Sequence, residues 1–243
     1  MANLALMYYH LEKYAEAEKL QIQVVDVRSR ILGAEHPVTI TTIAKLAMIY
    51  YNLKRYSEAE KLDIQIVDAR NRILGPEHPN TVTSTADLAL TYYNLEKYTE
   101  AQKLEIQVVD ARNRFFSSEH PDTVAAMADL ALTYYNLEKY TEAEKLEIQV
   151  VDARNRILGP EHPDTIAAMA DLALTYYNLE KYTEAEKLGI QVVGIRNRIF
   201  GLEHSDTVTA MANLALIYYH LEKYPEAEKL QIQVVDVQNT ILG

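Results

Sequence analysis

Apolar residues recur along much of the chain at alternating steps of three and four positions. Between residues 142 and 158 they stand at Ala143, Leu146, Val150, Ala153 and Ile157. This spacing places the apolar side chains on one face of a 3.6-residue turn, so it predicts an amphipathic α-helix, termed helix B here.

Both ends of helix B carry sequence signals. Thr141 and Glu144 have the spacing of a capping box, in which a hydroxyl and a carboxylate satisfy two free backbone N–H groups at the helix start. Gly159 followed by Pro160 predicts the stop, because glycine adopts the left-handed conformation easily and proline cannot continue the helix.

A second helical pattern, termed helix A, precedes helix B and is apolar nearly all round. It runs from about Pro121 to Asn136, and a proline in the first turn costs no helical hydrogen bond. Asp129, Thr133 and Asn136 form its one polar strip. We therefore expect helix A to be packed between neighbours with only this strip open. The short linker 137–140 predicts an antiparallel helix pair.

This helix pair is one copy of a unit that repeats through the chain with a period of 42 residues. A fixed period of this length predicts a repeat array in which each unit buries its apolar face on its neighbours. We predict an all-α fold, a right-handed superhelical solenoid of antiparallel helix pairs that forms a single domain over residues 1–243. The first helix is expected to be truncated, because Met1 is in register with Met127. The six repeats are expected at approximately residues 1–36, 37–78, 79–120, 121–162, 163–204 and 205–243.

Two repeats depart from the pattern. The third ends in the segment 115–118, Phe-Phe-Ser-Ser, so its stop signal is weaker. The fifth carries Gly189 and Gly194 inside helix B, and each interior glycine costs roughly 1 kcal/mol relative to alanine. We expect the helix over 184–200 to be the least stable full-length helix of the array.

Composition excludes several functions. The net charge of −11 argues against nucleic acid as a partner, because a phosphate backbone requires clustered Lys and Arg. The chain contains no cysteine, which excludes disulfides and thiolate metal sites. No apolar run approaches the roughly 18 residues that span a bilayer, and no signal peptide is recognisable at the N-terminus. We expect a cytoplasmic protein with no membrane partner.

Catalytic and metal sites are not predicted. Five histidines recur at the link between repeats, about 10 Å apart in a stacked array, whereas a metal needs its ligands at about 2 Å from one point. We interpret each as a histidine at a helix start; they are His36, His78, His120, His162 and His204. The chain has no recognisable nucleophile with its base and no glycine-rich phosphate loop. We expect no catalytic residues, no cofactor and no enzymatic activity.

The repeat resembles the tetratricopeptide repeat. Leu130-Ala131, then Tyr134, Tyr140 and Ala143 follow the spacing of that family, and six copies agree. The 42-residue length and the Leu-Gly-Pro-Glu-His-Pro tail are similar to the variant of kinesin light chains, which also occurs in fungal and bacterial NTPase-type immune receptors. Glu138, Glu147 and Val150 depart from the family's usual Gly, aromatic and Ala, which leaves the angle within the helix pair undetermined.

The resemblance implies a scaffold that binds a peptide or protein segment in a concave groove lined by helix A. Repeated Asn side chains would contact a peptide backbone, Tyr would offer a rigid amphipathic surface, and three Asp would favour Lys or Arg in the ligand. Lys45 is the one charge reversal among the Asp positions. The candidate residues are Lys45, Asn52, Asp87, Tyr93, Asn94, Asp129, Leu132, Tyr135, Asn136, Asp171, Tyr177, Asn178 and Asn213.

A second interpretation stays open. The middle repeats hardly differ at the groove positions, which also suits a structural or self-associating array without a single dedicated ligand. The last helix presents apolar residues such as Ile232 and Val235 that a following helix A would cover. Head-to-tail association of chains is therefore an alternative partner prediction.

Overall fold

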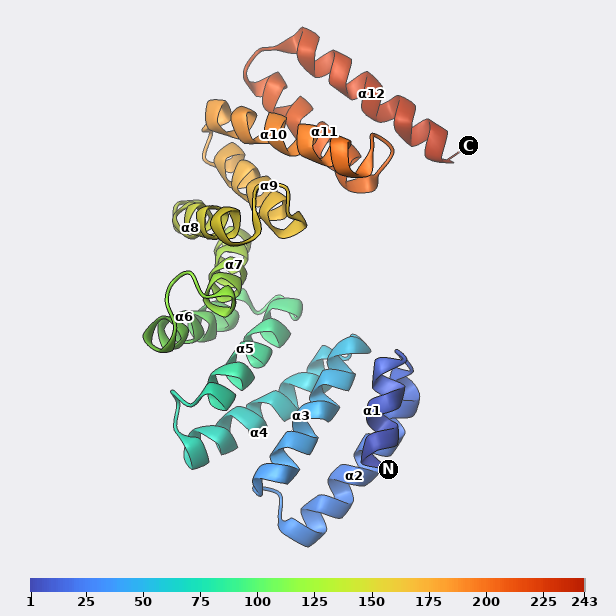
Figure 1. Ribbon diagram of the computed structural model, residues 1–243, viewed down its shortest axis with the longest axis vertical. Coiled ribbons are helices and arrows are strands. Elements are labelled where there is room, and N and C mark those ends of the chain that lie inside the picture. Colours follow the sequence, from blue (N-terminus) through green and yellow to red (C-terminus); the bar gives the residue numbers. More distant parts are fainter. Residues whose placement is uncertain (243) are drawn as a thin grey trace. The chain divides into compact units, whose positions relative to one another are not determined.

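The computed structural model describes residues 1–242, which form twelve α-helices and no strand (Figure 1). Helices A and B alternate as predicted. The helices A are α1 (Ala2–His10), α3 (Pro37–Asn52), α5 (Pro79–Asn94), α7 (Pro121–Asn136), α9 (Pro163–Asn178) and α11 (Ser205–His220). The helices B are α2 (Tyr14–Leu32), α4 (Tyr56–Leu74), α6 (Tyr98–Phe115), α8 (Tyr140–Leu158), α10 (Tyr182–Phe200) and α12 (Tyr224–Leu242). The predicted all-α array of about six helix pairs is confirmed.

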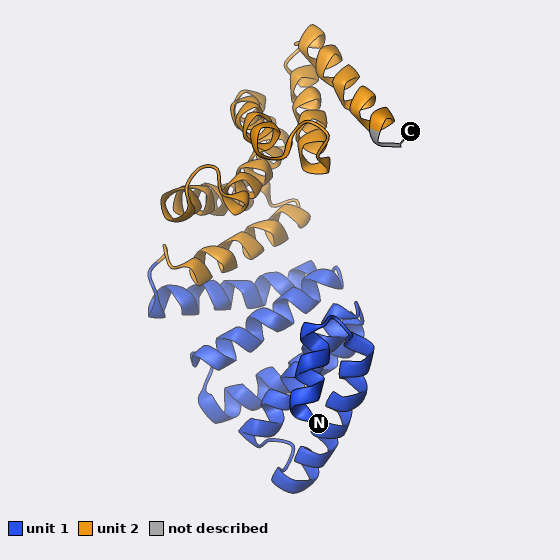
Figure 2. Ribbon diagram, turned by 45° about the vertical axis from the view of Figure 1, so that its right-hand side comes forward, with its two compact units in different colours: residues 1–117 blue, residues 118–243 orange. Residues whose placement is uncertain are grey.

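The chain divides into two compact units, Met1–Ser117 and Ser118–Gly243 (Figure 2). In each unit every helix packs against the next one along the chain. The division falls at the weak stop of the third repeat. There α6 ends at Phe115, and Phe116 follows in an extended conformation, with φ −123° and ψ 175°. Ser117 stands where the other complete repeats have a glycine with positive φ. The predicted single solenoid over 1–243 stays a prediction.

Each full helix A begins where the sequence predicts, and the preceding histidine caps it. The Nδ1 atom of His162 accepts a hydrogen bond from the backbone N–H of Asp164 at 3.2 Å, and the other four inter-repeat histidines do the same. A neutral imidazole has one unprotonated nitrogen, so it can accept this bond in place of the usual Ser or Asn side chain. The repeated histidines thus have a structural role.

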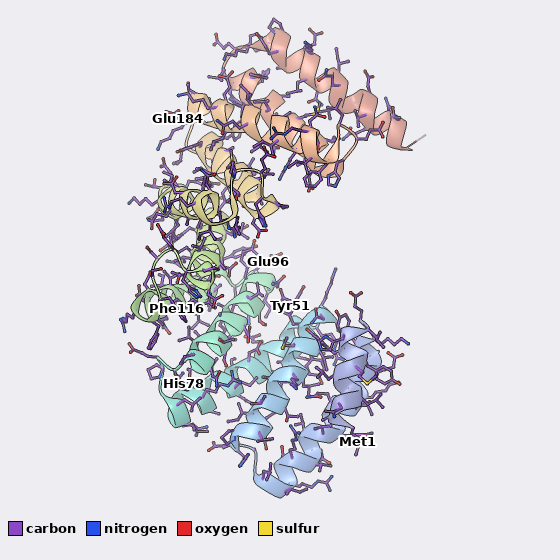
Figure 3. All side chains as sticks on the ribbon, viewed as in Figure 1. Met1, Tyr51, His78, Glu96, Phe116 and Glu184 are labelled. Carbon is purple, nitrogen blue, oxygen red and sulfur yellow. The ribbon has the colours of Figure 1, made fainter. Side chains whose placement is uncertain are left out.

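The turn between helices A and B places an acidic or basic residue where the family usually has glycine. Glu138 has a positive φ of 59°, and the equivalent residues of the other repeats have φ between 57° and 59°. One of them, Glu96, is labelled in Figure 3. The N–H of Glu138 donates to the Tyr135 carbonyl, and the N–H of Lys139 donates to Tyr134, both at 2.9 Å. These two bonds form a Schellman motif, which satisfies the last carbonyls of helix A. The left-handed conformation costs a residue with a side chain about 1–2 kcal/mol, but the geometry of the turn is kept.

The predicted capping box of helix B is wrong. Helix α8 begins at Tyr140 with Lys139 as its N-cap and without a side-chain capping bond, so Thr141 already lies inside the first turn. The Tyr135 and Tyr140 rings instead pack edge to face, 5.4 Å between centroids, across the turn that the Schellman motif fixes. At the other end Gly159 has φ 92° and ψ 163°. The positive φ is as predicted, but this ψ belongs to a region that is nearly exclusive to glycine rather than to the left-handed helix.

The apolar stripe of helix B forms the core, with one exception. Ala143, Val150 and Ala153 are buried as predicted and Leu146 is half-buried, whereas Ile157 remains exposed. Similar clusters recur in both units. One in the first unit joins Ile40, Ala47, Ile66 and Ala69, and one in the second joins Ile166, Met169, Val192 and Ala210. Each cluster joins residues of helices A and B, so the helices A are held on a packed framework within each unit.

Candidate binding surface

The predicted groove residues occupy equivalent places on successive helices A within each unit. Together they are called the helix A strip. Its exposed members are Lys45, Asn52, Asp87, Asp129, Leu132 and Asp171. Its half-buried members are Tyr93, Asn94, Tyr135, Asn136, Tyr177, Asn178 and Asn213. The buried neighbour Thr133 does not belong to it: this residue is 0% exposed, so its predicted place on the open face of helix A is wrong.

The asparagines of the strip bond to the protein itself. Asn94 Nδ2 donates to the hydroxyl of Tyr51 on the preceding helix A at 3.0 Å and to the Leu90 carbonyl at 2.8 Å. Asn178 makes the equivalent bonds to Tyr135 and Leu174 in the second unit. Both amide hydrogens are thereby used, so a ligand would find only the Oδ1 acceptor. Asn94 and Asn178 can therefore contact a peptide backbone as acceptors, but their amide hydrogens are engaged within the protein.

The strip aspartates lie between arginines of two helices B. Burial raises the pKa of the Asp87 carboxyl above its ordinary value, although its surface is accessible, because the helices around it displace solvent; Arg70 and Arg112 oppose the shift. Asp171 behaves in the same way between Arg154 and Arg196. A cationic ligand would therefore compete with these arginines for the strip aspartates.

A row of buried carboxylates beneath the strip was missed by the sequence interpretation. Asp63, Glu105 and Glu147 are 5–6% exposed. Thr91 donates to Asp63 Oδ2 at 2.8 Å, and Thr175 donates to Glu147 Oε1 at 2.9 Å. Burial raises the pKa of Asp63 to about 6 and that of Glu147 to about 7. The signal was available, because Glu147 stands where the family usually has an aromatic residue, and aromatic side chains contribute strongly to protein cores.

A pocket of about 250 Å³ opens on the strip in the first unit. Its walls come from α1, α3, α4 and α5, and they include Asn52 and Asp87 of the strip together with the buried Asp63. The strip residues Lys45, Tyr93 and Asn94 do not line it. The structure thus brings together two carboxylates from different helices that the sequence interpretation did not connect.

The described part of the chain contains neither a candidate metal site nor a candidate membrane span. Residues 1–242 contain no group of three or more His, Asp or Glu side chains that could hold a metal. No helix among them is long and apolar enough to cross a membrane.

The fold and strip together define an α-helical repeat array built from antiparallel helix pairs. The sequence pattern of the family described as "Tetratricopeptide repeat" matches residues 1–63, 40–114, 84–153, 122–188 and 167–240. The chain therefore belongs to the tetratricopeptide repeat family, whose members generally serve as non-catalytic scaffolds for protein–protein interaction.

Solved structures of kinesin-light-chain-like proteins are similar to this chain. The kinesin light chain "nearly identical TPR-like repeats" of Podosopora anserina are 31% identical with a TM-score of 0.74, covering 85% of this chain and 98% of that one. BtubC (BKLC) from P. vanneervenii is 16% identical with a TM-score of 0.74, covering 93% of each chain, and shares the fold alone. None of the curated proteins compared matches the chain.

Proposed function

We propose that this protein is a cytoplasmic, non-enzymatic scaffold that binds an extended basic or amphipathic protein segment along the helix A strip. The observation that carries the proposal is the strip itself. In each unit an exposed leucine accompanies accessible carboxylates on packed helices A: Leu90 with Asp87 in the first unit, and Leu132 with Asp129 and Asp171 in the second, both leucines being 42% exposed. A peptide that alternates apolar and cationic side chains would complement this surface.

Energetics indicates how such a ligand would be held. An exposed Asp–Lys pair contributes only about 0–1 kcal/mol. Micromolar affinity requires about 8 kcal/mol, so the charges alone cannot supply it. Most of the affinity must come from the half-buried tyrosines and the exposed leucines of the strip. The carboxylates would then select among ligands and speed their association.

The test is capture of a random basic peptide pool by the purified chain, with light scattering to follow its oligomeric state. We expect the protein to retain peptides and the triple variant Asp87→Asn, Asp129→Asn, Asp171→Asn to retain markedly fewer. The matched control replaces Asp68, Asp110 and Asp152, three exposed carboxylates of helices B, by Asn and makes the same charge change. Equal loss in both triple variants would mean that net charge, and not the strip, attracts peptides.

Self-association is a second candidate, favoured by the surface of α12. Gln231 is exposed, although its equivalents Gln21, Glu147 and Gly189 are buried against the following helix A; the adjacent Val235 is 45% exposed. A second copy of the chain could supply a helix A to this face. Oligomers that grow with concentration and that Val235→Asp abolishes would support this function, whereas a constant monomer mass would exclude it.

A further inference from the structure

We propose that the pocket in the first unit binds the side chain of a lysine or arginine from the bound segment, with Asp63 and Asp87 facing its cationic head. This inference rests on the proposed peptide-binding function and adds a position and a side-chain class to it. The carboxylates converge from α4 and α5, and the apolar wall beside them comes from α3 and α4, including Met48 and Ile66.

An equivalent space lies between the helices of two later pairs of repeats, but side chains fill most of it there. Two repeats on, the equivalent space measures about 20 Å³, because Glu147 replaces Asp63 with a longer side chain and Leu132 replaces Met48. Arg154 also lines that smaller space. A further repeat on, the space again measures about 20 Å³.

In the last of these three spaces, beside α10, the floor is apolar. Gly189 stands in the place of Asp63, and Ile217 stands in the place of Thr91. A Cβ atom added to Gly189 would lie 3.1 Å from Leu214 Cδ1 and 3.7 Å from Ile217 Cδ1, so neighbouring side chains already occupy the volume. The open, acidic form of this inter-repeat space therefore depends on the short carboxylate Asp63.

The charge at the pocket floor is negative. Asp63 Oδ2 accepts from Thr91, and no other hydrogen bond to this carboxyl occurs among the described residues, so Oδ1 remains for a ligand. The charged group that acts on it is Asp87, which is repulsive. Arg70, whose counterpart lines the second space, does not line this pocket; it donates to the Asn80 carbonyl at 2.8 Å and to the Ser84 hydroxyl.

The size of the pocket selects a side chain rather than a whole small molecule. Its volume of about 250 Å³ lies below the roughly 300–1,000 Å³ of typical ligand sites. Lysine and arginine combine an aliphatic stem with a charged end, and such side chains bury the stem on apolar surface while the head finds polar partners. The apolar wall and the carboxylate floor match these two parts.

The experiment compares four peptide sub-libraries with lysine, arginine, norleucine or citrulline fixed at one central position and random neighbours. We expect the parent protein to retain the lysine and arginine sub-libraries about tenfold better than their uncharged counterparts, a ratio equivalent to about 1.4 kcal/mol. Asp63→Asn, which removes the charge at constant size, should abolish the preference. Asp63→Glu, which keeps the charge but fills the pocket as in the fourth repeat, should abolish it too. Glu147→Gln is the matched control and should leave it unchanged.

The outcomes separate the two proposals. Peptides retained without a cationic preference, or with one that survives both Asp63 variants, would overturn the pocket assignment and leave the strip as a binding surface. Retention of no sub-library at all would overturn peptide binding and the pocket with it. Circular dichroism melting of each variant checks that it is folded, and Asp63→Glu has a natural precedent in the glutamates at the same position of the third and fourth repeats.

Discussion

At the scale of single residues, one position of helix B determines the chemistry beneath the strip. It carries Gln21, Asp63, Glu105, Glu147 and Gly189 in successive repeats, all of them buried. Each substitution changes a buried charge, a hydrogen bond or a volume at constant backbone geometry. The charge and volume beneath the strip thus differ from repeat to repeat, while the residues of the strip itself stay nearly constant.

The buried Glu147 makes stability depend on pH. Its pKa is raised from 4.5 to about 7, first by burial, so the folded state binds its proton more tightly than the unfolded chain does. Its contribution is complete below the unfolded value and is lost as the pH rises through about 7. Glu147→Gln should therefore stabilise the protein at pH 8, by roughly 1–3 kcal/mol as for an uncompensated buried polar group, and much less at pH 5.

Urea unfolding at both pH values measures this difference. The exposed Glu142→Gln in the same helix is the control and should not gain stability at pH 8 relative to pH 5. A Glu147→Gln effect of equal size at pH 5 and pH 8 would show that its charge is not the cause. Gln21 supplies the precedent, since its Nε2 donates to the Thr42 carbonyl at 2.8 Å in the first unit.

At the scale of elements, α10 carries two glycines that α8 lacks, and their surroundings are opposite. Gly194 is exposed, and an added Cβ would meet nothing within 4 Å. At Gly189 the Leu214 side chain occupies the space that a Cβ would need. Gly194 therefore weakens the helix without compensation. At Gly189, packing of the Leu214 side chain from α11 offsets part of the cost.

This contrast sharpens the prediction that α10 is the least stable full-length helix. Gly194→Ala should stabilise the protein by about 1 kcal/mol, and Gly189→Ala should give less because Leu214 must move. Amide hydrogen exchange should show α10 less protected than α8 in the parent chain and more protected in Gly194→Ala. Equal protection of the two helices in the parent chain would refute the prediction.

At the scale of the whole molecule, the chain has two compact units of three helix pairs each. About three repeats are needed for a stable array, so each unit has close to the minimum by itself. The segment between them lacks the glycine that ends the other complete helices B, because Phe116 and two serines stand there. The weakest stop signal in the sequence thus coincides with the division.

We predict that fragments 1–117 and 118–243 each fold in isolation, with helical circular dichroism and a cooperative thermal transition. As a comparison, the chain cut between residues 78 and 79 leaves a first fragment with only two helix pairs, one of them short. That fragment should melt well below fragment 1–117. Unfolded 1–117 or 118–243 fragments would contradict the autonomy of the units.

The sequence by itself determined the repeat, the helix pairs, the start of helix A and the glycine stops of helix B, because these follow from local periodicity and from Pro and Gly at helix ends. The start of helix B is set instead by the turn that precedes it. The sequence also placed Asp87, Asp171 and Leu132 on an accessible face. It did not indicate that the carboxyl of Glu147 is buried, and it assigned the buried Thr133 to that open face. Burial depends on which helix packs above a residue, and a single helical period does not contain that information.

Only the tertiary structure decided which polar residues face a ligand and which face the protein. The hydroxyl of Tyr51 reaches Asn94, and Asp63 meets Thr91, because the period stacks successive repeats in register. The pocket also follows from packing: the short side chain of Asp63, beside Thr91 where the fifth-repeat counterpart meets Ile217, leaves volume among four packed helices. Contacts between repeats are distant in sequence, so their consequences for the site appear only once the helices are packed.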